Sequence, residues 1–197
     1  MSILKVVASA RTEDALSREV ARYLVQKLGE PVTTRDLVAS PLPTLSPADL
    51  VAVHGSHHDG EASTEAHLAL SEALINELRS ATTLVIATPM YNFAVPSYLK
   101  QWIDYVCRAG VTFRYTKQGP EGLLNIDQAY LITATGGTPV GGAWDFASPY
   151  LEHVCRFLGI PSVIHIEASG SKGSRETVLA EALEQVDRLP ALQARQS

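Results

Sequence analysis

The chain has 197 residues, of which 46% are hydrophobic, and a formal net charge of -5. That length and apolar content suffice for one domain with a substantial core, so we expect a single domain over residues 1–197. The mild negative charge without a basic run argues against a nucleic-acid-binding surface, and no stretch approaches the roughly 20 apolar residues that span a bilayer. Cys107 and Cys155 lie far apart and outside any CxxC spacing, which predicts reduced thiols in a cytoplasmic protein.

Apolar runs alternate with segments of helical periodicity along the chain. In chain order the pattern predicts a strand (3–9), a helix beginning at Ser17, a strand (31–37), a helix (about 64–80), a strand (82–89), a helix opened by Pro96, a strand (128–135), a helix (148–159), a strand (161–168) and a helix (174–189). The stretch 38–63, rich in Pro, Ser and His, is expected to be an excursion and not a second domain.

The five predicted strands are too continuously apolar to have one face in water. Such strands, alternating with helices, predict an α/β fold with a parallel sheet that helices cover on both sides. Ligands of these sheets bind outside the carboxyl ends of the strands, at a topological switch point. The candidate site therefore lies in the loops that follow the first, third and fourth strands.

The loop after the first strand, "SARTEDALS" (9–17), leads into a helix. Ser9 and Ser17 offer hydroxyl groups. The backbone amides of Ala15, Leu16 and Ser17 are expected to be free at the helix N-terminus, where phosphate is the usual occupant. The alternative is that Ser17 is an ordinary N-cap. Neither GxxxxGK[ST] nor GxGxxG follows the strand, so the anion should be a monophosphate on a larger molecule.

The loop after the third strand contains Met90, Tyr91, Asn92 and Phe93. Backbone groups and the Asn92 amide can hydrogen-bond the edge of a heterocycle, and the large side chains offer apolar area to a ring. The alternative is that these side chains only pack beneath the loop.

The loop after the fourth strand, "ATGGTPVGGAWDF" (134–146), has four glycines. Gly136 and Gly137 allow close approach of the backbone to a ligand or positive φ, whereas a plain flexible loop is the alternative. All three loops share one edge of the sheet, which favours a common ligand. A phosphate at the first loop and a ring with a polar edge at the other two fit flavin mononucleotide (FMN).

The sequence segments that contain these loops resemble those of a known family. "TPMYNFAVPSYLKQWIDYVCRAGVTFRYTKQGPEGLL", "RDLVASPLPTL", the glycine pair and "SPYLEHVCRFLGI" are similar to segments of the FMN-dependent NADH:quinone oxidoreductases, the bacterial azoreductases. The resemblance covers nearly the whole chain. It implies a flavodoxin-like three-layer sandwich with a five-stranded parallel sheet, a homodimer and one non-covalent FMN per subunit. The implied reactions are two-electron reduction of quinones and reductive cleavage of aromatic azo bonds.

By this resemblance the FMN contacts are Ser9, Ala15, Leu16, Ser17, Met90, Tyr91, Asn92, Phe93, Ala134, Thr135, Gly136 and Gly137. The candidates for the substrate pocket are Tyr115, Trp144, Phe146, Tyr150 and Phe157, with core packing as the alternative for each of them. The chain departs from the family at Ala15, where a serine is typical; losing one hydrogen bond to phosphate costs about 1.5–3 kcal/mol and predicts weaker FMN retention. It also has Thr135 where arginine is common, which removes a cation near the flavin.

The flavin carries the chemistry and the protein supplies orientation, so no catalytic side chain is predicted. NADH is expected to reduce the flavin and leave before the quinone or azo compound enters the same place, which gives ping-pong kinetics. Two alternatives remain: a flavodoxin-like single-electron carrier that serves a protein partner, and a flavin-free relative. His54, His57 and His58 match no standard metal spacing, so no metal site is expected.

Overall fold

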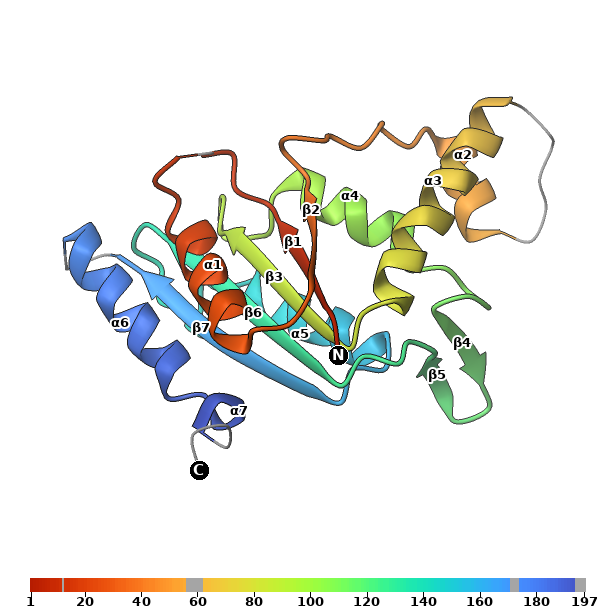
Figure 1. Ribbon diagram of the computed structural model, residues 1–197. Helices are drawn as coiled ribbons and strands as arrows, with labels where there is room; N and C mark the ends of the chain where they lie inside the picture. The colour runs from red at the N-terminus through yellow and green to blue at the C-terminus, as the bar shows by residue number, and fades with distance from the viewer. Residues whose placement is uncertain (12, 56–61, 171–173, 194–197) are drawn as a thin grey trace.

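The computed structural model describes residues 1–11, 13–55, 62–170 and 174–193. Five parallel strands form one sheet in the order β2-β1-β3-β6-β7 (Figure 1). The strands are β1 Ile3–Val7, β2 Val32–Asp36, β3 Thr83–Pro89, β6 Gln128–Thr135 and β7 Ser162–Ser169. The predicted five-stranded parallel sheet is confirmed. The chain leaves β1 toward one edge to form β2 and then returns past it to β3, so the switch point lies between the ends of β1 and β3.

Helices cover both faces of this sheet and produce three layers (Figure 1). They are α1 Leu16–Leu28, α2 Pro47–His54, α3 Ala62–Arg79, α4 Ser97–Val106, α5 Ser148–Phe157, α6 Arg175–Asp187 and α7 Pro190–Gln193. Leu84 and Ile86 of β3 face the core that α3, α4 and α5 cover, whereas Val85 and Ala87 face α1 and α6. Burial on both faces explains why β3 is apolar throughout. Within the described ranges, none of the helices combines the length and apolar composition needed to cross a membrane.

The excursion 38–63 contains a helix that the sequence analysis did not predict. Ser46 accepts a hydrogen bond from the amide of Asp49, and the Asp49 carboxylate accepts one from the amide of Ser46, which together form a capping box in front of α2. Pro47 occupies the first turn, where its missing N–H costs nothing. The helix has only eight residues, which is too short for a clear apolar periodicity.

A second difference concerns the segment "GVTFRYTKQGPEGLL", for which the sequence analysis predicts neither a strand nor a helix. It forms an antiparallel hairpin of β4 (Phe113–Thr116) and β5 (Gly119–Gly122). Figure 1 shows the hairpin beyond the amino-terminal ends of the sheet strands, on the side away from the arrowheads. Gly122 lies against the end of α5: a Cβ atom on Gly122 would come within 2.1 Å of the Gly159 backbone nitrogen. Glycine is therefore required for the hairpin to dock here.

Candidate functional site

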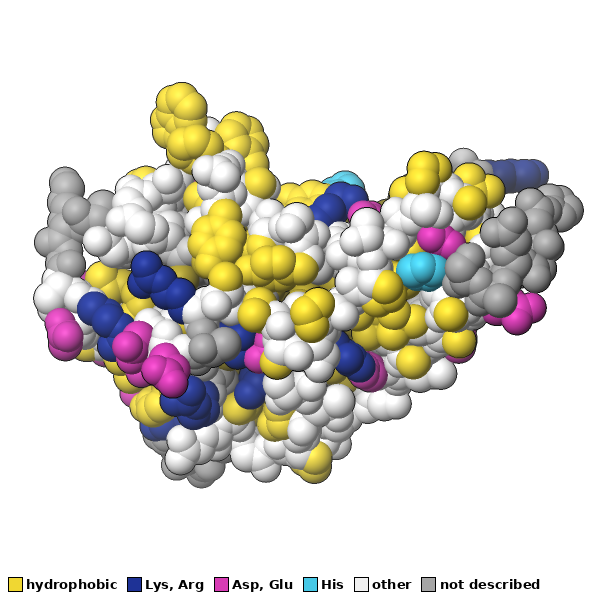
Figure 2. Space-filling model, turned by 90° about the horizontal axis from the view of Figure 1, so that it is seen from above, with side chains coloured by type: hydrophobic (Ala, Val, Ile, Leu, Met, Phe, Trp, Pro, Cys, Tyr) yellow, Lys and Arg dark blue, Asp and Glu magenta, His cyan; other side chains and the backbone are white. Residues whose placement is uncertain are grey.

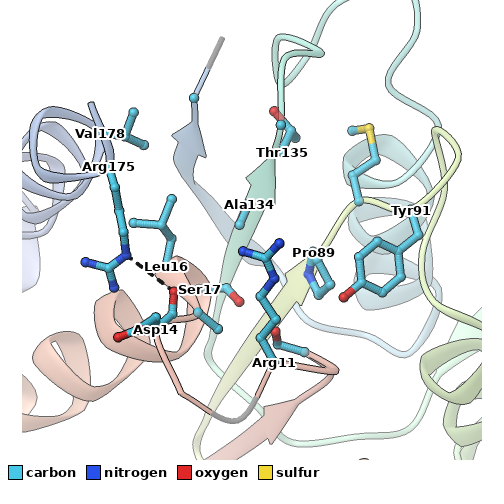
Figure 3. A pocket seen from close by; sticks show the side chains of 15 residues that line it. Arg11, Asp14, Leu16, Ser17, Pro89, Tyr91, Ala134, Thr135, Arg175 and Val178 are labelled. Atoms are coloured by element: carbon cyan, nitrogen blue, oxygen red, sulfur yellow. Dashed lines mark hydrogen bonds between the residues drawn. The ribbon is translucent and has the colours of Figure 1, made fainter. Parts of the chain in front are cut away.

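A cavity of about 520 Å³ opens at the carboxyl ends of β1, β3, β6 and β7. It is lined by Ser9, Arg11, Asp14, Ala15, Leu16, Ser17, Pro89, Met90, Tyr91, Ala134, Thr135, Gly136, Gly170, Arg175 and Val178. Figure 3 shows side chains from all four strand ends directed toward a common space. Nine of the twelve predicted FMN contacts are in this lining, so the structure brings the three predicted loops together.

The N-terminus of α1 forms one end of the cavity. Ala15 is the N-cap residue and its side chain makes no capping hydrogen bond, so the first amides of the helix keep free N–H groups. Ser17 is not the N-cap; it lies inside the first turn, and only 1% of it is exposed. Its Oγ is buried and has no hydrogen-bond partner within the described part of the chain. A buried hydroxyl of this kind beside free amides is suited to an anionic ligand.

An arginine holds the first loop in place. Arg18 donates from Nη2 to the carbonyl oxygen of Ser9 over 2.9 Å and pairs with Asp36 at the end of β2, its Nη1 lying 2.5 Å from Oδ2. Burial alone would raise the pKa of Asp36, but the Arg18 guanidinium and the amides of Val38 and Ala39 hold that pKa below its usual value. This ion pair fixes the backbone around Ser9 without occupying the cavity.

The second loop is a tight turn at the end of β3. Tyr91 and Ala94 exchange two backbone hydrogen bonds, and the residues between them have positive φ, 49° at Asn92 and 70° at Phe93. The amide of Met90 donates to the carbonyl oxygen of Ala134 over 2.8 Å, which joins the second loop to the third. Tyr91 and Phe93 are 41% and 47% exposed, so they do not pack beneath the loop. Asn92 and Phe93 lie outside the cavity lining.

The third loop is ordered by its own hydrogen bonds. Thr135 donates from Oγ1 to the carbonyl oxygen of Thr138 over 2.6 Å. Positive φ occurs at Gly141 (73°) and not at Gly136 or Gly137, so unusual backbone angles do not require glycine at this pair. Gly136 lines the cavity, and Gly137 is exposed outside it.

Asp145 anchors the far end of the third loop. Its carboxylate accepts hydrogen bonds from the amides of Gly141, Ala147 and Ser148 over 2.8, 2.9 and 2.9 Å. Burial would raise the pKa of Asp145, but these amide donors more than offset it and the pKa lies below its usual value. The carboxylate thus connects the glycine-rich loop to the first turn of α5.

Two predicted substrate-pocket residues lie near the second loop. Trp144 is 65% and Phe146 61% exposed. The Trp144 and Phe93 rings are 5.7 Å apart, and the amide of Phe146 donates to the carbonyl oxygen of Phe93. Figure 2, which views this face from above, shows hydrophobic side chains beside basic ones. Tyr150 is half-buried and packs against the main core.

None of the five predicted substrate-pocket residues is in the cavity lining, and Phe157 and Tyr115 lie away from the strand ends that form it. Phe157 is the last residue of α5, near the amino end of β7, whereas the cavity is at the carboxyl ends. It is half-buried and packs on Phe113 with ring centroids 4.3 Å apart, as the core-packing alternative expects. Tyr115, on the hairpin, is 75% exposed and contacts the edge of the Phe113 ring.

Sequence reasoning missed several residues of the cavity: Arg11, Asp14, Pro89, Gly170, Arg175 and Val178. Three of these follow β7, whose loop was left out because only the first, third and fourth strand ends were considered. The sheet order places β7 beside β6, so its carboxyl end borders the same site. Asp14 is exposed and also borders the cavity.

No metal site is found among the described residues, where no group of His, Cys, Asp and Glu side chains has suitable geometry. His54 Nε2 lies 2.7 Å from the carbonyl oxygen of Asp104. His57 and His58 lie outside the described residues.

Comparisons with known proteins agree with this architecture. The family model for the flavodoxin-like fold matches residues 1–189. Among solved structures, the azoreductase AzrA superposes with a TM-score of 0.84 at 25% identity, covering 100% of both chains. An FMN-dependent NADH-azoreductase from Bacillus anthracis, solved in complex with FMN, has a TM-score of 0.85 at 23% identity and covers 100% of this chain and 99% of its own.

Relatives found by sequence have a higher identity to this chain than these two solved structures. The FMN-dependent NADH:quinone oxidoreductase 1 of Hahella chejuensis is 46% identical over 192 residues, which cover 93% of this chain and 92% of the relative. A protein of the same name from Jannaschia sp. is 40% identical over 189 residues, covering 96% and 98%. The chain therefore belongs to the flavodoxin-like family and, within it, to the FMN-dependent NADH:quinone oxidoreductases.

Proposed function

We propose that this protein is an FMN-dependent oxidoreductase that uses NADH to reduce quinones by two electrons and to cleave aromatic azo bonds. The observation that carries the proposal is the buried Ser17 hydroxyl, which has no partner within the described residues and lies at the uncapped start of α1, inside a cavity that also reaches Met90 and Tyr91. One end of this cavity suits a phosphate, and the other suits a ring.

The residues present fit FMN. The amides of Leu16 and Ser17, with the Ser17 hydroxyl, would hold the phosphate, and Ser9 would support this loop from β1. Met90 and Tyr91 would lie along the ring, and the backbone at Thr135 and Gly136 would border its polar edge. When bound there, the flavin supplies two-electron transfer between a nicotinamide donor and an oxidised acceptor. We also propose Asn92, Phe93 and Gly137, which lie outside the cavity lining beside residues that form it, as FMN contacts.

The protein itself would position the flavin and the substrate and exclude water from between them. The hydrogen bond from the Met90 amide to Ala134 keeps the second and third loops at a fixed separation. The exposed rings of Phe93 and Trp144 give an incoming aromatic substrate an apolar surface near the cavity. Such a site favours flat aromatic acceptors without requiring an acid or base from the protein.

We further propose a homodimer. Tyr115 and Phe157 lie toward the amino-terminal ends of the sheet strands, whereas the cavity of their own chain opens at the carboxyl ends. If they form part of a substrate pocket, a second copy of the chain has to bring them there. We also propose a cytoplasmic location, because Cys107 and Cys155 are free thiols.

Spectroscopy of the loaded protein tests the proposed function. The protein is saturated with FMN, freed of excess flavin and mixed with NADH without oxygen. Rapid bleaching of the visible flavin bands, reversed by a quinone, is the expected result. Flavin that binds but stays oxidised would favour the single-electron carrier, and absence of FMN binding would favour the flavin-free relative.

A further inference from the structure

Arg175 lies beside the start of α1, although it comes from a distant part of the chain. It is the first residue of α6, and its side chain lines the cavity. Its Nη2 is 2.5 Å from Oε2 of Glu19, and its Nε donates to the carbonyl oxygen of Asp14 over 3.4 Å. Figure 3 shows the Arg175 side chain on the same side of the cavity as Asp14 and Ser17. The guanidinium is thus held at the end of the cavity that suits a phosphate.

The Arg175 guanidinium has N–H groups that make no hydrogen bond within the described residues. Arginine has five N–H groups, and the two contacts with Glu19 and Asp14 use only some of them. Within the described residues, Nη1 of Arg175 has no hydrogen-bond partner. The buried Ser17 hydroxyl, also without a partner there, is an independent polar group in the same place. Both residues line the same cavity and keep hydrogen-bonding capacity for a ligand there.

Acidic side chains lie close to the start of α1. Glu19 lies in the first turn of α1, and Asp14, which lines the cavity, precedes the helix, so two carboxyl groups lie near the helix start that we assign to a phosphate. Negative charges of these carboxylates near the site would weaken the binding of an anion. Arg175 is paired with Glu19, and its charge offsets this repulsion. A guanidinium also binds phosphate more strongly than a neutral hydroxyl does.

We propose that Arg175 is a phosphate-binding residue and that its free N–H groups replace the hydrogen bond that Ala15, lacking a hydroxyl, cannot make. The proposal rests on the proposed function, because the phosphate in question is that of FMN. The competing account is that Arg175 only ties α6 to α1 through Glu19. The two accounts differ in one measurable respect: only a phosphate contact discriminates FMN from riboflavin, which has the same ring and no phosphate.

Binding titrations of FMN and riboflavin provide the test. Arg175→Gln should weaken FMN binding about tenfold or more, as expected for a lost charge-assisted hydrogen bond, and leave riboflavin affinity unchanged. The matched control is Arg188→Gln at the C-cap of the same helix, where the arginine pairs with Glu184 and both side chains are well exposed. The control should bind both flavins as the wild type does. Arg175→Lys, which keeps the charge, should recover part of the FMN affinity.

Two further variants exclude indirect effects. Glu19→Gln in the Arg175→Gln background removes the carboxylate that the first change leaves unpaired; full recovery of FMN affinity would overturn a direct contact. In an Ala15→Ser background, Arg175→Gln should cost less FMN affinity than in the wild type, because the new hydroxyl shares the phosphate. Equal losses for FMN and riboflavin, or no loss in a wild type that binds FMN, would overturn this inference alone. A wild type that binds neither flavin would overturn the proposed function as well.

Discussion

Ser17 has opposite effects on stability and on cofactor binding in the proposed site. Its Oγ is buried without a partner in the described part of the chain, and such a hydroxyl costs about 1–3 kcal/mol. Ser17→Ala removes this cost and places a better helix former in α1. We expect the flavin-free variant to be at least as stable as the wild type in thermal unfolding. We also expect its FMN affinity to fall about tenfold or more.

Ser71 is the matched control for this prediction. It is also a fully buried serine in a helix, but its Oγ donates to the carbonyl oxygen of Tyr105 over 2.6 Å. Ser71→Ala should therefore lower the free energy of unfolding by about 1–3 kcal/mol and leave FMN affinity unchanged. If Ser17→Ala also destabilised the flavin-free protein, the hydroxyl would have a structural partner, and its assignment to phosphate would lose its basis.

At the scale of single residues, a cavity residue can be predicted from the sequence when a suitable residue type directly follows a predicted strand. Ser17 and Tyr91 follow strands whose carboxyl ends meet, so their presence in one cavity could be inferred. Arg175 could not, because an arginine at a helix start after the last strand has no distinctive motif. The positive φ of Asn92 and Phe93 is equally unpredictable, since it depends on a turn closed by Tyr91 and Ala94.

The position of the hairpin depends on a close contact between two elements. Any side chain on Gly122 would meet the backbone of Gly159, and the hairpin would have to move away from α5. Gly122→Ala should lower the free energy of unfolding in urea by about 1–3 kcal/mol and speed amide hydrogen exchange in β4 and β5. Gly136→Ala, where a Cβ atom has open space, is the control for stability. Equal stability of the two variants would show that the hairpin is not fixed by this contact.

The elements that the sequence analysis missed are short, and the strands of the hairpin lack strong local signals. β5 reads Gly-Pro-Glu-Gly, and proline and glycine are both unfavourable in strands. It forms because Tyr115 pairs with Pro120 across the hairpin and because Gly122 docks on α5. The long apolar strands and amphipathic helices were predictable within two or three residues, since their burial pattern extends over several turns or pleats.

The stability of the whole molecule should depend on pH through its anchored carboxylates. Asp36 and Asp145 have pKa values below their usual range in the folded protein, despite burial, because they accept hydrogen bonds. Such groups stabilise the fold fully above the unfolded pKa, near 4, and lose this contribution as the pH falls through the folded pKa. We expect the free energy of unfolding to fall from about pH 5 downward. Asp145→Asn should be less stable at pH 7 and show a shallower decline; parallel curves for the two proteins would contradict the role of this carboxylate.

The proposed dimer predicts that each active site needs two chains. A chain with Ser17→Asp should not hold FMN, because a carboxylate would face the phosphate. A chain with Tyr115→Ala and Phe157→Leu should hold FMN but reduce quinones poorly. It lacks the two aromatic side chains that we propose as one wall of the substrate pocket. Each variant alone should therefore have low activity.

A purified dimer of one chain of each kind distinguishes the two possible sources of the wall. If the wall comes from the partner, one site of the pair combines intact FMN contacts with intact Tyr115 and Phe157. Quinone reduction should then recover to about half that of the wild-type dimer, because one of two symmetric sites is complete. If Tyr115 and Phe157 served the cavity of their own chain, neither site would be complete, and the mixed dimer would stay as inactive as its parents. Sedimentation at the assay concentration must show a dimer, because a monomer with full activity would exclude a shared site.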